Sequence, residues 1–243
     1  PASAPESSIR VAVSKVDALI NLVGELVITQ AMLKQQSTVL DPVLNEKLIN
    51  GLNQLDRNTR DLQEAVMGVR MMPVDFVFSR FPRMVRDLAG RLGKSVRMKT
   101  IGEGTELDKG VIEKISDPLV HLVRNSIDHG LELPDERIAA GKDETGTITL
   151  SASHQGGHIV IEVADDGRGL DRDRIVAKAR ERGVVLPDVV SDAEAFQLIL
   201  LPGLSTAKEV TDVSGRGVGM DVVKKNIIAL GGTIEIASKP GLG

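Results

Sequence analysis

The 243-residue sequence contains no cysteine, tryptophan or tyrosine, and only four phenylalanines. Without cysteine, disulfides and thiolate metal sites are excluded, and the composition fits the reducing cytoplasm, which is the location we expect. The scarcity of aromatic rings and a net charge of −4 argue against nucleic acid as a partner. No apolar run approaches the length needed to span a bilayer. Apolar residues nevertheless make up 42% of the chain, enough for an aliphatic core.

The first part of the chain has the periodicity of two helices. Residues 1–8 are small and polar, which is typical of a linker. Apolar residues at helical spacing then form two stripes, Val16, Ile20, Val23 and Val27 followed by Leu44, Leu48, Leu52, Leu55, Leu62, Val66 and Val69. Between them Asp41 and Pro42 are typical of an N-cap and a first helical residue, and Pro73 ends the second stripe. The pattern predicts a helical hairpin over residues 9–72.

Two helices alone cannot bury both apolar stripes, so the hairpin needs another surface. The heptad-like spacing favours a second copy, which would give a four-helix bundle across a two-fold axis. The alternative is that the hairpin docks on the downstream part of its own chain. We predict a homodimer through residues 9–72.

Residues 73–243 mix helical and strand patterns. Helical periodicity covers 76–92, 109–129, 173–182, 192–200 and 221–230, and strand patterns cover 95–100, 147–153, 159–163 and 233–237. The middle two strands flank Gly156-Gly157, which is typical of an antiparallel hairpin. This order of mostly antiparallel strands and helices predicts an α+β fold, with a two-layer α/β sandwich after the helical hairpin.

A first polar cluster, HLVRNSIDHG, occupies residues 121–130. On a helix, His121, Asn125, Asp128 and His129 share one face, and the apolar residues between them are directed to the opposite face. These groups suit Mg²⁺ and phosphate, because one amide oxygen together with substrate phosphates is enough for this ion. The alternative is a solvated helix face with incidental histidines.

Two further clusters are rich in glycine. In DDGRG, residues 165–169, a strand ends in a carboxylate that can accept a hydrogen bond from an exocyclic amine such as adenine N6, and glycines let the backbone approach a ligand. In GRGVG, residues 215–219, alternating glycines precede a helix N-terminus that suits an anion. The alternatives are an ordinary Asp-Gly turn and a flexible loop.

In this order the three clusters resemble the N box and the two glycine boxes of the GHKL ATP-binding superfamily, and residues 196–206 resemble the F box of its ATP lid. Within the superfamily the chain resembles the chemotaxis histidine kinases from about residue 9 onwards, through segments such as VDALINLVGELVITQ and VSGRGVGMDVV. The resemblance implies a dimerisation hairpin and an ATP-binding kinase domain over 73–243, with a further family strand expected after Gly243.

The resemblance also implies roles for individual residues. Asn125 would coordinate Mg²⁺ and Asp165 would bind adenine. His121 is the catalytic candidate, because related hydrolases carry there a Glu that activates water. The other implied ATP contacts are Arg124, Asp128, His129, Gly167, Gly169, Lys178, Ser205, Thr206, Gly215, Gly217, Val218, Gly219 and Met220.

None of the four histidines lies in residues 9–72, so the hairpin is predicted to be a dimeriser and not a phosphoacceptor. The resemblance implies that the acceptor is a histidine on a separate phosphotransfer domain. It also implies a coupling protein, chemoreceptors and response regulators as partners. Together these features predict a dimeric, ATP-dependent protein-histidine kinase of bacterial chemotaxis.

Other functions stay open at this point. A GHKL ATPase of the hydrolase type would carry Glu at the position of His121, and a non-catalytic dimerisation scaffold would not need Asn125 or Asp165. Residues 80–99 hold seven basic residues and one acidic residue, a pattern of either nucleic-acid binding or a solvated rim. The acidic total favours the rim.

Overall fold

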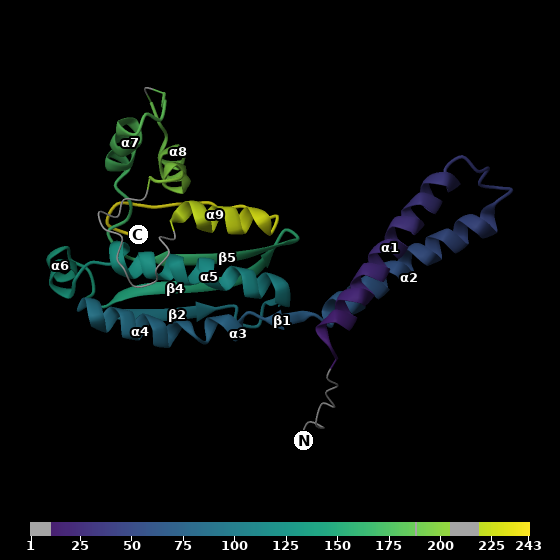
Figure 1. The fold of residues 1–243 in the computed structure, drawn as a ribbon, viewed down its shortest axis with the longest axis horizontal. Coiled ribbons are helices and arrows are strands. Elements are labelled where there is room, and N and C mark those ends of the chain that lie inside the picture. Colours follow the sequence, from purple (N-terminus) through teal and green to yellow (C-terminus); the bar gives the residue numbers. More distant parts are fainter. Residues whose placement is uncertain (1–10, 188, 205–218) are drawn as a thin grey trace, which may run out of the picture. The chain divides into compact units, whose positions relative to one another are not determined.

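A computed structural model describes residues 11–187, 189–204 and 219–243. The chain falls into two units, residues 1–71 and residues 72–243. The first holds the helices α1 (Val13–Ser37) and α2 (Glu46–Gly68), and the second holds all the strands of the main sheet (Figure 1). The expected class, a helical hairpin followed by a two-layer α/β sandwich, is confirmed.

The two helices of the first unit lie side by side and bury polar as well as apolar groups between them. Gln30 and Thr59 are buried, and Gln30 donates a hydrogen bond to the carboxylate of Asp56. Lys34 Nζ donates to the same carboxylate at 3.0 Å. The hydrogen bond from Gln30, followed by that from Lys34, lowers the pKa of Asp56 to about 2. This polar contact fixes the register of α1 against α2.

The second helix begins later than the sequence pattern indicates. Asp41 Oδ1 accepts hydrogen bonds from the backbone of Val43 and Leu44 at 2.8 and 3.3 Å, so it does cap a turn. Asn45 then leaves helical geometry at φ −117° and ψ 22°, and α2 starts at Glu46. The prediction that Pro42 is the first residue of the helix is therefore wrong, because the capped turn closes before the helix begins.

Helix α1 is apolar over more of its surface than α2 covers. Its most apolar 18-residue window has a mean hydropathy of 1.5 and is 17% buried, so by length and composition it is apolar enough to cross a membrane. The expectation that no apolar run approaches this length is wrong by that measure. Exposed apolar residues recur at multiples of seven positions, namely Leu19, Leu26 and Leu33 on α1 and Leu48, Leu62 and Val69 on or directly after α2. We call these six residues the heptad stripes.

The second unit is built on a three-stranded sheet in the order β2-β4-β5. Its strands are β2 (Val96–Ile101), β4 (Gly146–Gln155) and β5 (His158–Asp165). The expected antiparallel pairing of β4 with β5 is confirmed, and Gly156 and Gly157 make the turn at φ 57° and 82°. The pairing of β2 with β4 is parallel, which the sequence pattern did not predict.

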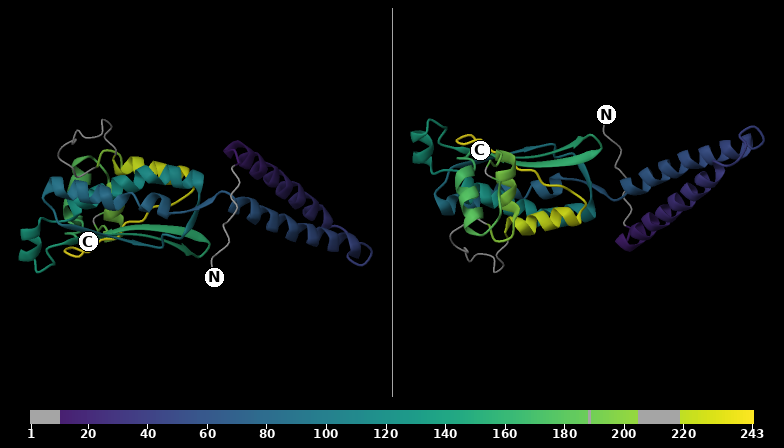
Figure 2. Two further views of the ribbon diagram at one scale, coloured as in Figure 1. Left: turned by 90° about the horizontal axis from the view of Figure 1, so that it is seen from below. Right: turned by 90° about the horizontal axis from the view of Figure 1, so that it is seen from above.

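Among the described residues, helices cover one face of this sheet and no helix covers the other (Figure 2). The covering helices are α4 (Phe81–Leu92), α5 (Lys109–Asn125) and α9 (Met220–Ala229). The smaller elements are β1 (Met71–Pro73), α3 (Asp75–Phe78), β3 (Glu106–Asp108), a π-helical turn (Ser126–Gly130), α6 (Pro134–Ala139), α7 (Arg172–Glu181), α8 (Asp192–Gln197) and a 3₁₀ turn (Leu198–Leu200). Helices α7 and α8 pack around a separate cluster that includes Phe196.

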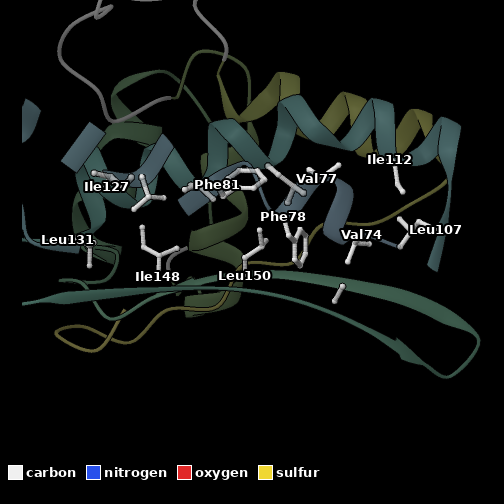
Figure 3. Packing of buried hydrophobic residues seen from close by; sticks show 14 residues of the cluster. Val74, Val77, Phe78, Phe81, Leu107, Ile112, Ile127, Leu131, Ile148 and Leu150 are labelled. Carbon is white, nitrogen blue, oxygen red and sulfur yellow. The ribbon is translucent and has the colours of Figure 1, made fainter. Parts of the chain in front are cut away.

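The main core lies between the helical layer and the sheet (Figure 3). Alternate residues of β4 face the helices, so Ile148, Leu150 and Ala152 are buried. Phe78 and Phe81 enter from α3 and α4, and this pair supplies the only aromatic rings of the cluster. The helical side is completed by α5 with Leu119 and Val123 and by Ile127 of the π-helical turn. The core thus holds the first polar cluster against the sheet.

Two elements differ from the sequence pattern. The helix expected over residues 76–92 is two helices, because the chain turns at Ser79 and Arg80 before Pro82 restarts a helix in its first turn. The strand expected over residues 233–237 is absent from the described structure, where this segment has no regular secondary structure and pairs with no strand. Alternation of apolar residues predicts an extended segment, but it does not supply a partner strand.

Candidate nucleotide-binding site

The first polar cluster spans the end of α5 and a change of helical type. Leu131 N donates to Ser126 O at 2.8 Å, a bond that spans five residues and defines the π-helical turn. Such turns are rare and occur frequently at functional sites, because the extra residue re-aims the side chains that follow. His121 and Asn125 both lie on α5, four positions apart, so they share one face of the helix as expected. Beyond it the π-helical turn shifts the angular positions of Asp128 and His129, which a uniform helix cannot predict.

Lys94 holds the end of this segment in place. Its ammonium donates hydrogen bonds to the carbonyl oxygens of Ile127, Asp128 and Leu131 at 2.6, 3.0 and 2.9 Å. Burial lowers the pKa of Lys94, with the Asp128 carboxylate acting in the opposite direction. Sequence reasoning grouped Lys94 with a solvated basic rim, and no local signal distinguishes it, because its partners are backbone atoms more than thirty positions away.

His121 and Arg124 lie on α5, one turn apart. Burial, and next the positive charge of Arg124, lower the pKa of His121, so this imidazole is neutral near pH 7. The Nε atom of Arg124 is buried and makes no hydrogen bond within the described part of the chain. An unpaired buried guanidinium nitrogen is costly, and an anionic ligand oxygen is a suitable acceptor for it.

Asn125 contacts the start of α9. Its Nδ2 atom donates to Met220 Sδ at 3.4 Å, which joins two candidate site residues that are 95 positions apart in the sequence. Because the amide nitrogen faces sulfur, the Oδ1 atom is left for another ligand. Gly219 is the N-cap of α9, so the backbone N–H groups of the first turn lie beside this amide.

The DDGRG loop closes directly on the end of the first cluster. Asp165 Oδ1 accepts from Gly167 N at 3.0 Å, and Arg168 N donates to Gly130 O at 3.0 Å. A Cβ atom at Gly130 would stand 2.9 Å from Asp165 Oδ2, and one at Gly167 would collide with Gly130 O. The close approach of the Gly130 backbone requires glycine at 167, and the Asp165 carboxylate itself occupies the space of a side chain at 130. Together the two glycines form a cradle around the Asp165 carboxylate.

Other expected site residues lie further along the chain. Gly169 adopts φ +73° against the backbone of Lys239, so it shapes the loop. Lys178 is half-buried on α7, which packs on α8. Ser205, Thr206, Gly215, Gly217 and Val218 fall outside the described residues.

A metal at this site would need the nucleotide as a co-ligand. In the described ranges, no three His, Asp or Glu side chains converge in a way that could hold a metal ion. The chemistry on offer is one amide oxygen of Asn125, a carboxylate in a glycine cradle and a guanidinium nitrogen without an acceptor. This set fits a magnesium-bound nucleotide, whose phosphates complete the coordination of the ion.

Comparison with known proteins gives two family matches. Residues 6–69 match the model for the signal transducing histidine kinase, homodimeric domain. Residues 114–243 match the model for the histidine kinase-, DNA gyrase B-, and HSP90-like ATPase. The boundary between these matches falls in the same part of the chain as the boundary between the two structural units.

Relatives of this chain are found in several bacteria. The chain is 62% identical over 244 residues to chemotaxis protein CheA of Salmonella typhimurium, a match that covers 100% of this chain and 36% of that protein. It is 46% identical over 239 residues to chemotaxis protein CheA of Bacillus subtilis, covering 97% of this chain and 35% of that protein. The chain thus spans about a third of the length of these relatives. It belongs to the histidine kinase-, DNA gyrase B- and HSP90-like ATPase family, and within it resembles chemotaxis protein CheA over its whole length.

Proposed function

We propose that this chain is the dimerisation and catalytic core of a cytoplasmic chemotaxis histidine kinase. It binds Mg-ATP and transfers the γ-phosphoryl group to a histidine on a separate phosphotransfer domain. The observation that carries the proposal is the junction of three distant segments, in which Asp165 meets Gly130 and Asn125 meets Met220. The family matches and the relatives named CheA support the same function.

Asp165 is the proposed selector of the base. Its Oδ1 atom is already bonded to Gly167 N, which fixes the carboxylate and leaves Oδ2 to accept from adenine N6. Guanine presents an acceptor in place of that amine, so the same carboxylate repels it. A charge held in one orientation before the ligand arrives needs little further ordering on binding.

Asn125 and Arg124 are the proposed phosphate end of the site. Asn125 Oδ1 would be the protein ligand of Mg²⁺, and Arg124 Nε would donate to a phosphate oxygen. The metal, when bound, neutralises charge that develops on the phosphates during transfer. Asp128, His129 and Lys178 and the glycines of residues 215–219 are proposed as further phosphate contacts by family resemblance.

His121 is the proposed catalytic residue. In the transfer, a bond forms between the acceptor imidazole nitrogen and the γ-phosphorus, and the bond from that phosphorus to the β–γ bridging oxygen breaks. The acceptor imidazole loses its N–H proton. Because the lowered pKa keeps His121 neutral, its imidazole can take up that proton.

The acceptor histidine is proposed to lie on a separate domain, because none of the histidines of this chain is suitably placed. The sequence has four histidines, and none is in α1 or α2. His121 and His129 belong to the site itself, and His154 and His158 flank the β4–β5 turn. A turn of the same sheet cannot present a nucleophile in line with the γ-phosphate of a second site. The coupling protein, chemoreceptors and response regulators are proposed as partners of the whole kinase.

The heptad stripes support the proposed homodimer. Leu19 and Leu62 are 50% and 44% exposed in the single chain, although neither is polar. A two-fold pairing of hairpins would bury both stripes in a four-helix bundle and remove this apolar area from water.

The test is incubation of the purified chain with radiolabelled ATP and Mg²⁺, alone and with a phosphotransfer domain from a CheA protein. We expect acid-labile label on the added domain and none on this chain. Asn125→Asp should strongly reduce transfer, while the exposed control Lys99→Met leaves it unchanged. Label on this chain in the absence of the added domain, or steady ATP hydrolysis without transfer, would overturn the proposal.

A further inference from the structure

The two adjacent carboxylates of the DDGRG loop point to different neighbours. Asp165 faces Gly130 and Gly167, as described above. Asp166 Oδ1 instead accepts from Thr147 N at 2.8 Å and lies 3.1 Å from the guanidinium of Arg137. One carboxylate is thus directed to the candidate ligand site, and the other anchors the loop to β4.

Lys142 binds the backbone of the same loop. Its Nζ atom donates to Asp166 O at 3.0 Å, to Gly167 O at 2.6 Å and to Glu132 Oε1 at 2.8 Å. These bonds use all three protons of the ammonium. Lys142 comes from the connection between α6 and β4, and its side chain is 16% exposed. It therefore fixes the loop through its backbone carbonyl oxygens, whereas the Asp165 carboxylate binds the loop through the N–H of Gly167.

Arg137 and Glu132 complete a buried ionic cluster. Arg137 is 1% exposed and donates to Glu132 Oε2 at 3.1 Å, to Asp166 O at 3.2 Å and to Asp143 O at 2.7 Å. Burial opposes ionisation of Glu132, but the hydrogen bond from Lys142 and the positive charges of Lys142 and Arg137 outweigh it and lower its pKa. The cluster is charged, and none of its buried side-chain nitrogen or oxygen atoms lacks a hydrogen-bond partner.

A buried ionic cluster of this kind contributes little to the net stability of the fold. Moving the charges out of water costs about as much as the pairing returns, and apolar residues of the same size are often neutral or stabilising in their place. Arg137 and Lys142, however, both donate hydrogen bonds to carbonyl oxygens of the loop that carries Asp165. These bonds indicate that the cluster fixes the geometry of this loop.

We propose that Lys142, braced by Glu132 and Arg137, is a positioning residue for the base-binding carboxylate of Asp165. This inference rests on the proposed nucleotide site. Lys142 holds the carbonyl oxygens of Asp166 and Gly167. The N–H of Gly167, which shares a peptide group with the Asp166 carbonyl, donates to Asp165 Oδ1. Loss of the ammonium leaves Asp166 O with Arg137 as its one cationic partner and removes the Lys142 bond from Gly167 O. This loosens the peptide that donates to Asp165 and allows the carboxylate to turn away from the base.

The first experiment uses the whole chain with Lys142→Met, which keeps the length of the side chain and removes its charge. Binding of ATP and of inorganic tripolyphosphate, both with Mg²⁺, is measured by calorimetry. We expect the affinity for ATP to fall about tenfold, the scale of one lost charge-assisted hydrogen bond, and the affinity for tripolyphosphate to change less than about twofold. The exposed Lys99→Met is the matched control and should bind both as the native chain does.

The second experiment measures the local stability of the DDGRG loop in the absence of ligand. Hydrogen exchange at the Gly167 amide should be at least about tenfold faster in Lys142→Met than in the native chain, because that amide is bonded to Asp165. Lys142→Gln, which retains two neutral N–H donors in place of the ammonium, should lie between the two and serves if the methionine variant does not fold.

The outcomes separate the two proposals. Unchanged ATP affinity in both variants, or an equal loss for ATP and tripolyphosphate, would overturn the positioning role of Lys142. A native chain that binds no ATP would overturn the proposed function instead. In that case the hydrogen-exchange rate of the Gly167 amide would still test the role of Lys142. If this amide exchanges as slowly in the variants as in the native chain, Lys142 does not position the loop.

Discussion

The carboxylate of Asp165 packs against the backbone of Gly130, so closely that a methyl group on Gly130 would stand 2.9 Å from Oδ2. This contact joins the end of the first polar cluster to the first glycine-rich loop across 35 positions of sequence. In the sequence, neither Asp165 nor Gly130 alone indicates this contact. Gly130 has a φ in the ordinary region, so its reason for being glycine is space and not backbone freedom.

Gly130→Ala tests this contact. The added methyl must displace the Asp165 carboxylate, so we expect ATP affinity to fall about tenfold or more while the melting temperature changes little. Calorimetry and thermal unfolding monitored by circular dichroism measure the two quantities. Gly90→Ala is the control, because open space surrounds that helical position. It should bind ATP normally and be more stable by up to about 1 kcal/mol. Normal ATP binding by Gly130→Ala would contradict the cradle.

Asp165→Asn tests base selection. The amide still accepts at Oδ1 from Gly167, but it loses the charge that binds adenine N6. We expect ATP binding to weaken by about 1–3 kcal/mol and the preference for ATP over GTP to shrink. Competition between the two nucleotides against a fluorescent ATP analogue gives the ratio. If the native chain binds ATP and GTP equally, the assignment of Asp165 to adenine is wrong.

Much of this fold can be predicted from the periodicity of apolar residues and from the residues that favour turns. The β4–β5 hairpin follows from alternation around two glycines, and the α1–α2 hairpin follows from two apolar stripes. The parallel pairing of β2 with β4 could not be predicted from local patterns, because it depends on the path of the long connection between the two strands. The same holds for the unpaired segment 233–237.

The candidate site shows the same division. Asp165 and Asn125 stand out because polar residues interrupt local patterns, and their type suggests their chemistry. Lys94 and Lys142 gave no signal, because each bonds to backbone carbonyls that any sequence provides. The π-helical turn is likewise invisible in SIDHG, since it differs from an α-helix by one residue in the spacing of its hydrogen bonds. Supporting groups of this kind are found only in three dimensions.

Leu26→Asp combined with Leu62→Asp tests the dimer. Both residues lie in the heptad stripes and face away from the buried α1–α2 contact, so we expect a monomer that keeps its helical content. Light scattering and circular dichroism give the mass and the helicity. Val23→Asp is the contrasting variant. Val23 is buried within one hairpin, so this charge should melt α1 and α2 themselves. A double variant that remains a dimer would place the interface elsewhere.

His121→Gln tests proton transfer through its pH dependence. Burial, followed by the charge of Arg124, lowers the pKa of His121 below 6.5, so the imidazole is neutral and able to accept a proton at pH 7. Protonation removes that ability as the pH falls through the lowered pKa. We therefore expect the ratio of native to variant transfer rates to be large and constant above pH 6.5 and to decline towards one in acid. Taking the ratio cancels the titration of the acceptor histidine, which is common to both proteins. A ratio that stays constant from pH 5 to 8 would show that His121 acts by position alone and takes no proton.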